Sequence, residues 1–128
     1  MKRPAINYSM FDRYACKALL AHPVIKSDRV RRYVKEYMIT DGMMPEEVRR
    51  KGITNSSVYN IDINKAITHL KKMGLLNRQT GGYYSVKDEY KTALNDKLND
   101  TQFWINLRAC ANSKHEEEDL FNPVQDLI

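Results

Sequence analysis

The sequence predicts a mainly α-helical protein with one small β-hairpin. Apolar residues recur at helical spacing along most of the chain, and Gly, Pro and polar cap residues separate these stretches from one another. Only in residues 75–86 does the pattern change, to two short β-prone runs that flank Gly81 and Gly82. A chain of 128 residues has room for one ordinary domain, which excludes a large multidomain enzyme.

The first two helices are expected at residues 8–21 and from Ser27 to a stop at Gly42. In the first, Ser9 and Asp12 resemble a capping box, in which side chains bond the free backbone N–H groups at a helix start. In the second, Ser27 is the expected N-cap, and the apolar stripe leaves the opposite side to solvent. That opposite side is basic, through Arg29, Arg31, Arg32 and Lys35.

The third and fourth helices lead into the hairpin. A helix of one or two turns is expected at residues 45–51, because Pro suits its first turn and Gly52 ends it. A longer helix is expected at residues 60–73, with Ser56 and Asn60 as alternative N-caps. Its apolar stripe consists of Ile63, Ala66, Ile67, Leu70 and Met73.

Two further helices and a tail are expected after the hairpin. Residues 87–98 form the first helix, and a break at residues 99–101 separates it from a second that is rich in aromatic and aliphatic residues. Residues 113–128 contain an acidic run and Pro123, and are expected to form a flexible tail. Cys16 and Cys110 have no partner at metal-ligand or redox-motif spacing, so a reduced, buried pair is expected.

The helices near the two ends of the chain have apolar faces that need burial. They can pack against each other or across the two-fold axis of a dimer. The side chains concerned are Phe11, Tyr14 and Leu19 near the start, and Phe103, Trp104 and Leu107 near the end.

Positive charge is concentrated in the first three quarters of the chain. The net charge is +5, but residues 1–91 hold 18 Lys and Arg against 9 Asp and Glu, a balance of +9. Residues 92–128 hold 3 against 7, a balance of −4. This asymmetry favours an acidic partner such as nucleic acid for the first part, with an acidic tail that is solvated, competes for the basic surface or binds something else.

Several classes of protein are not expected. No apolar run approaches the roughly 18 residues that span a bilayer, and no signal-like stretch follows the first residues, so a cytoplasmic protein without membrane contact is predicted. His22, His69 and His115 are dispersed, and no phosphate-binding loop or metal-spaced set is present in the sequence. We therefore expect no enzyme activity, no cofactor and no metal.

Three consecutive segments resemble the winged helix-turn-helix domain of small prokaryotic or phage-type regulators. They are residues 45–52, the stretch Ile63–Leu76 that ends in Gly-Leu-Leu, and the hairpin. The resemblance covers residues 28–86, and it departs from the family in the long stretch 53–61, where a turn of about 3 to 4 residues is usual. It implies that the helix at 60–73 enters the DNA major groove, and that the hairpin contacts the DNA backbone as the wing.

The resemblance divides the chain into four parts. Residues 1–26 and 87–112 would supply helices for packing or dimerisation on either side of a winged domain at residues 27–86. Residues 113–128 would be the acidic tail.

The outward positions of the helix at 60–73 have the chemistry that base reading needs, because Asn suits adenine, Lys suits guanine, and Thr offers a hydroxyl and a methyl. The predicted base-reading residues are Asn60, Asn64, Lys65, Thr68 and His69. The predicted phosphate-binding residues are Arg49, Arg50, Lys51, Lys71, Lys72, Arg78, Gln79 and Thr80. Tyr83 and Tyr84 alternate across the wing strand, so one is expected to pack inward.

These features together predict a small, sequence-specific transcriptional regulator that binds double-stranded DNA as a homodimer. Two alternatives remain at this stage. One is a winged-helix adaptor or phage-type accessory factor that binds a host replication or transcription protein, with residues 119–121 and 126–128 of the tail as docking peptides. The other is a protein that binds structured RNA.

Overall fold

The computed structural model describes residues 8–44, 59–79, 81–112 and 122–127. It contains the helices α1 (Ser9–Ala21), α2 (Ser27–Thr40), α4 (Asn60–Lys72), α5 (Asp88–Asp96) and α6 (Thr101–Asn112), and the short 3₁₀ helix η1 (Pro123–Asp126). The strands are β1 (Ile25–Lys26), β2 (Leu76–Gln79) and β3 (Tyr83–Val86). The predicted class, mainly helical with a small hairpin, is confirmed. The short helix expected at residues 45–51 lies outside the described residues.

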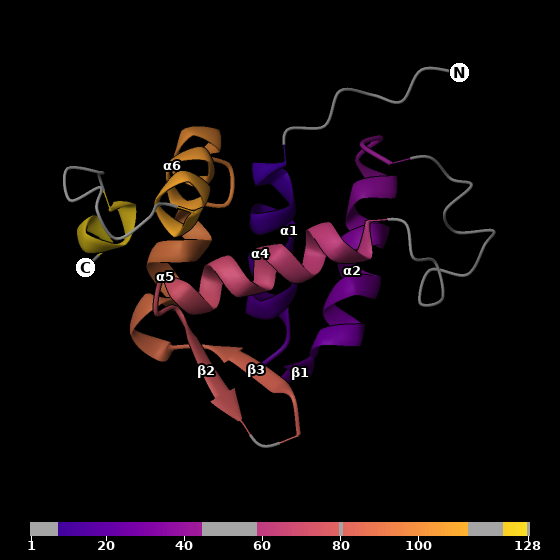
Figure 1. Cartoon of the computed structure of the whole chain (residues 1–128), viewed down its shortest axis with the longest axis horizontal. Helices are drawn as coiled ribbons and strands as arrows, with labels where there is room; N and C mark the ends of the chain where they lie inside the picture. Colours follow the sequence, from indigo (N-terminus) through magenta and orange to yellow (C-terminus); the bar gives the residue numbers. More distant parts are fainter. Residues whose placement is uncertain (1–7, 45–58, 80, 113–121, 128) are drawn as a thin grey trace.

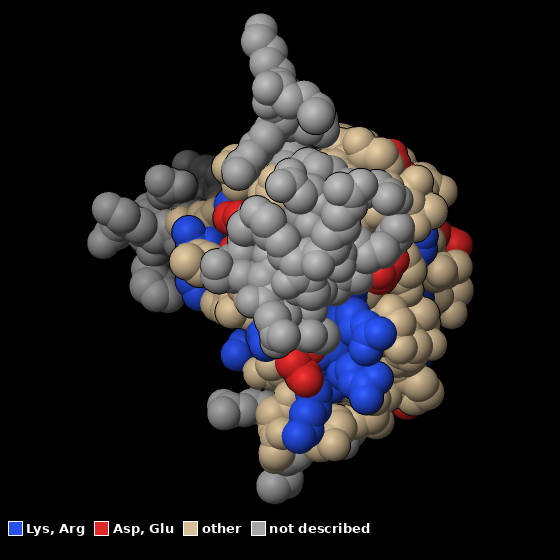
Figure 2. Space-filling view, turned by 90° about the vertical axis from the view of Figure 1, so that its right-hand side faces the viewer, with Lys and Arg blue, Asp and Glu red and all other residues tan. Residues whose placement is uncertain are grey.

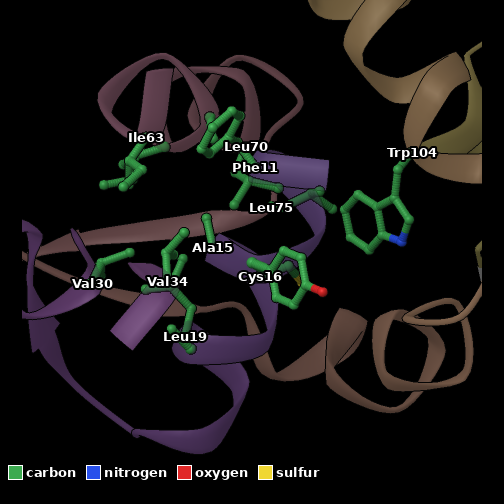
Figure 3. Packing of buried hydrophobic residues seen from close by; sticks show 14 of the residues in the cluster. Phe11, Ala15, Cys16, Leu19, Val30, Val34, Ile63, Leu70, Leu75 and Trp104 are labelled. Atoms are coloured by element: carbon green, nitrogen blue, oxygen red, sulfur yellow. The ribbon is translucent and has the colours of Figure 1, made fainter. Parts of the chain in front are cut away.

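Helix α1 lies at the centre of the core. It packs against α2, α4 and α6, and Figure 1 shows α4 crossing the middle of the molecule in front of it. Phe11, Tyr14 and Leu19 of α1 are at most 2% exposed. Figure 3 shows side chains of α1, α2 and α4 meeting at the centre, with Trp104 of α6 at one side.

The apolar faces at the two ends of the chain bury each other within one molecule. Phe103, Trp104 and Leu107 of α6 belong to the same buried cluster as the side chains of α1. Packing together, the first of the two arrangements expected for these faces, is therefore confirmed. Both cysteines are free thiols, with Cys16 buried and Cys110 only partly so.

A three-stranded antiparallel sheet in the order β1-β3-β2 attaches the hairpin to the helices. Ile25 pairs with Tyr84 and Lys26 with Tyr83, and α2 begins at the residue after β1. Gly81 and Gly82 close the turn with φ angles of +82° and +78°, which glycine adopts without the strain that a Cβ would cause. The hairpin therefore has a fixed orientation relative to α1 and α2.

Two of the predicted helix caps are wrong. Ser9 is the first residue of α1 rather than its cap, because Tyr8 occupies the cap position, and the side chains of Ser9 and Asp12 are buried inside the core. Ser27 is the first residue of α2 rather than its cap, since Lys26 before it belongs to β1. The break before α6 is confirmed, because Oδ1 of Asp100 accepts a hydrogen bond of 3.1 Å from the backbone N–H of Phe103.

The prediction of a flexible tail over residues 113–128 is wrong in the part that the structure describes. Residues 123–126 form η1, which packs against α6, and Val124 is only 8% exposed. Asn122 caps η1 by accepting a 3.0 Å hydrogen bond from the N–H of Val124. An apolar side chain in an acidic segment therefore anchors this end to the core. Residues 113–121 lie outside the described residues.

The sequence predicted Lys35 on the solvated basic face of α2, and this prediction is wrong. Lys35 is 0% exposed, and its Nζ donates a 2.6 Å hydrogen bond to Oδ1 of Asn60 at the start of α4. Burial lowers the pKa of Lys35, and the nearby charge of Arg31 acts in the same direction. The lysine stem fills space between the two helices, while the ammonium helps to fix the start of α4 against α2.

Replacing Asn60 is expected to cost more stability than replacing Lys35. In Asn60→Ala the buried ammonium loses an acceptor, which costs about 1–3 kcal/mol of unfolding free energy. In Lys35→Met the charge is removed and most of the volume is kept, so the cost is smaller. Urea unfolding at pH 7 measures both values, and a larger loss in Lys35→Met would contradict this view of the contact.

Candidate nucleic-acid interface

The outer face of α4 brings together three of the predicted base-reading residues. Asn64, Lys65 and Thr68 are exposed, while Ile63, Ala66, Ile67 and Leu70 face the core. The hydroxyl of Thr68 donates a 3.0 Å hydrogen bond to the carbonyl of Asn64 one turn earlier, which leaves its methyl group as a free contact. The three side chains thus form one compact polar surface.

The other two predicted base readers do not face outward. Asn60 is half-buried and accepts from Lys35 of α2. His69 is 4% exposed, with Nδ1 2.9 Å from Oδ1 of Asp12 and Nε2 3.0 Å from Oδ1 of Asn112. The prediction of outward positions for these two is wrong, because α4 contacts α2 at its start and α1 and α6 near its end.

Asp12, His69 and Asn112 form a buried polar network that joins α1, α4 and α6. Since Oδ1 of Asn112 can only accept, Nε2 of His69 carries a hydrogen, and one further proton lies between Nδ1 and Asp12. Burial raises the pKa of Asp12, although the His69 bond and the charge of Arg108 act against this shift. Among the described residues, Oδ2 of Asp12 has no hydrogen-bond partner.

Basic side chains of α2 border one side of the α4 surface. NH1 of Arg31 donates a 3.1 Å hydrogen bond to Oδ1 of Asn64, so the two helices are linked at the point where bases would be read. Arg32 is exposed at the next position of α2, whereas Arg29 lines a separate pocket with Tyr33 and Tyr83. Figure 2 shows the Lys and Arg side chains gathered over the N-terminal half of this helix.

The hairpin borders the same region below α4. Tyr83 is 39% exposed, whereas Tyr84 is partly buried against the core, so the predicted alternation of the two tyrosines is confirmed. Lys71, exposed at the end of α4, holds its Nζ 5.4 Å from the ring centroid of Tyr84 and thereby connects helix and hairpin.

The remaining predicted phosphate contacts are only partly placed. Lys72 is exposed on α4. The structure describes the backbone of Arg78 and Gln79 in β2 but not their side chains, and residues 49–51 and Thr80 lie outside the described residues.

A groove of about 390 Å³ runs along α4 on the side away from α2, between this helix and α6. Its lining includes Asn64, Lys65 and Thr68, the three outward side chains named above, together with Arg108 and Asn112 of α6. Sequence reasoning missed the two α6 residues, because nothing local signals that a helix so much later in the chain lies beside α4.

The described residues contain no group of three or more His, Cys, Asp and Glu side chains that could hold a metal ion. The ring of His22 stacks on the ring of Tyr33, with 4.3 Å between the two ring centroids.

In the part of the chain that the structure describes, none of the helices has the length and apolar character to cross a membrane.

Comparisons of the chain with protein-family models, with curated proteins and with solved structures find no match. What the α4 surface can do therefore follows from its own side chains. It offers amide, ammonium and hydroxyl groups on an exposed helix, with guanidinium groups at two of its borders, and this set of groups suits an anionic, hydrogen-bonding partner.

Removing His69 is expected to destabilise the fold strongly. His69→Ala leaves Asp12 buried without its partner, and breaking a buried pair in this way costs about 3–5 kcal/mol. His22→Ala is the matched control, because that ring stacks on Tyr33 and the loss of this stacking costs about 0.5–1.5 kcal/mol beyond the lost area. Denaturant unfolding compares the two variants. Equal losses of unfolding free energy would show that the hydrogen bonds of His69 add no more stability than the packing of an imidazole ring.

The raised pKa of Asp12 predicts a pH dependence of stability. The unfolded chain releases this proton near the usual value of 3.8, whereas the folded chain keeps it to higher pH. The contribution of Asp12 is therefore fully present below pH 3.8 and is lost as the pH rises through the raised folded pKa. The unfolding free energy of the wild type minus that of Asp12→Asn should fall over this window. A difference that grows with pH would show a lowered pKa instead.

Proposed function

We propose that the chain is a winged helix-turn-helix protein that binds double-stranded DNA as a sequence-specific transcriptional regulator. In this proposal α4 enters the major groove and the β2-β3 hairpin lies on the DNA backbone. The observation that carries it is the exposed set Asn64, Lys65 and Thr68 on α4, bordered by Arg31 of α2 on one side and by the hairpin at its end.

The way the hairpin follows α4 supports this proposal. Gly74 turns the chain with a φ of +75°, and the N–H of Leu75 donates a 3.1 Å hydrogen bond back to the carbonyl of Leu70. β1 then attaches the far strand of the hairpin to the start of α2. A helix and a wing that must meet one duplex together need such a fixed relative orientation.

The side chains on α4 suggest how bases would be read. Lys65 can reach the acceptors of guanine, and the methyl group of Thr68 suits the methyl of thymine. Asn64 reads adenine with both ends of its amide, but Arg31 occupies its oxygen in the free protein. Reading adenine would therefore release Arg31, whose guanidinium is then available to a neighbouring phosphate.

Charge supports the same proposal. The balance of +9 over residues 1–91 covers all the elements from α1 to the hairpin. Arg31 bonds Asn64 at one border of the reading surface, and Lys71 is exposed at its end. Such a distribution attracts duplex DNA at long range and makes affinity fall with salt.

The homodimer and the adaptor remain predictions. The apolar side chains that suggested a dimer are buried within one chain, so a dimer no longer follows from them. Of the two docking peptides that the adaptor would use, residues 119–121 lie outside the described residues, and Leu127 in the other packs against the core.

The decisive experiment compares two matched triple variants. The first is Asn64→Ala, Lys65→Ala, Thr68→Ala on α4, and the control is Asn95→Ala, Lys91→Ala, Thr92→Ala, which removes the same three side-chain types from exposed positions of α5. Lys91 pairs with the exposed Asp88, and such surface pairs contribute little to stability.

The duplex is first selected with wild-type protein from a random pool, and affinity is then measured across a salt series against a scrambled duplex. We expect the α4 variant to lose at least about tenfold in preference for the selected site, and the control to keep it. Equal preference in both variants, or no site preference in the wild type, would contradict the proposed function.

A further inference from the structure

The groove between α4 and α6 has an unusual balance of hydrogen-bonding groups. Three cations line it, Lys65 and Lys72 from α4 and Arg108 from α6, and among the described residues no Asp or Glu does. Its other polar side chains are Asn64, Thr68, His69 and Asn112. The volume of about 390 Å³ is within the range of small-ligand sites.

The two amides of the groove have their oxygen atoms already occupied. Oδ1 of Asn64 accepts from Arg31, and Oδ1 of Asn112 accepts from Nε2 of His69. Each oxygen keeps a second lone pair, and each amide also has its NH₂ end for a further partner. Together with the two ammonium groups and the guanidinium, these NH₂ ends make the groove rich in donors.

Arg108 is held in place before any ligand arrives. Its NH1 donates a 3.2 Å hydrogen bond to the carbonyl of Tyr8, and its Cζ lies 5.6 Å from the centroid of the Tyr8 ring. One N–H of the guanidinium is used in this way, and the others remain as donors. A pre-positioned guanidinium loses less conformational entropy on binding an anion than a mobile one.

The floor of the groove keeps the two helices at a fixed separation. His69, which lines the groove, is bonded to Asn112 of α6 on one side and to Asp12 of α1 on the other. The donors of α4 and α6 therefore face a common space whose width is set by buried hydrogen bonds.

We infer that the groove between α4 and α6 binds a phosphate group. A phosphate carries the negative charge and the several acceptor oxygens that three cations and two amide NH₂ groups can satisfy together. The phosphate can belong to a free phosphorylated molecule or to the DNA backbone, and only the second case rests on the proposed function. Since Asn64 and Lys65 belong both to the groove and to the base-reading surface, a free phosphate compound would compete with DNA.

The first arm of the test titrates inorganic phosphate into the protein at constant ionic strength and pH 7, followed by amide chemical shifts. Arg108→Gln is compared with Arg13→Gln, because Arg13 is a matched arginine outside the groove. Its NH1 also bonds a backbone carbonyl, that of Leu98 at 3.4 Å, and its guanidinium also lies over a tyrosine ring. We expect Arg108→Gln to weaken phosphate binding at least about tenfold, and Arg13→Gln to leave it unchanged.

The second arm measures duplex DNA binding across a salt series with the same variants. If the phosphate is that of the DNA backbone, Arg108→Gln lowers the slope of log K against log salt by about 0.9, while Arg13→Gln does not. Lys72→Gln, at an exposed position on α4, repeats both arms should Arg108→Gln fail to fold.

A loss of inorganic phosphate binding in the groove variants supports the proposal with a free ligand. A reduced salt slope alone supports it with DNA as the source. Phosphate binding that is absent or insensitive to both groove variants, together with an unchanged salt slope, overturns it. If the wild type binds no duplex at all, the proposed function fails and the phosphate titration alone decides the groove.

Discussion

The buried hydrogen bond between His69 and Asp12 determines which side of α4 faces outward. Asp12 is buried in α1, where its carboxyl group bonds Nδ1 of His69. His69 comes from α4 and bonds Asn112 of α6 through its other nitrogen. With this side of α4 held inward, Asn64, Lys65 and Thr68 lie outward, so the candidate interface depends on a buried network that joins three helices.

The surface around α4 is built by residues that are far apart in the chain. Arg31 of α2 holds the amide of Asn64 on one side, and Arg108 of α6 lies across the groove on the other. Each guanidinium is oriented by a bond to another part of the protein, Arg31 by Asn64 and Arg108 by the carbonyl of Tyr8. Cations held in this way add geometric selectivity to the long-range attraction of a basic chain.

The sequence alone was sufficient to predict the helices whose apolar residues recur with a clear period, and the hairpin with its Gly-Gly turn. The stripes of α1, α2 and α4 were found because apolar side chains recur every three to four residues, and the hairpin was found because Gly81 and Gly82 suit a tight turn. β1 was missed, since a strand of two residues has no period to detect. Its existence depends on pairing with β3 much later in the chain.

The errors at the candidate site have one physical cause. Periodicity assigns polar residues to the solvent side of a helix, but Lys35, Asn60, Asp12 and His69 satisfy one another in two buried or half-buried pairs. Only the position of Asp12, directly after Phe11 in an apolar helix, hinted at such a partner. Lys65 and Thr68 were placed correctly because they lie opposite the apolar stripe. Asn64 and His69 flank the stripe equally on its two sides, and His69 is buried because α1 and α6 cover its side.

The packing of α6 against α1 has a consequence for how the protein folds during synthesis. The helix at the centre of the core precedes in the chain the helix that covers one side of it, and Tyr8 and Arg108 are 100 residues apart. Contacts of such long range form late, since the intervening chain must be closed into a loop. During synthesis the apolar surface of α1 that α6 covers therefore stays exposed until α6 has emerged, so the core cannot be completed by stepwise folding of α1 to the hairpin alone.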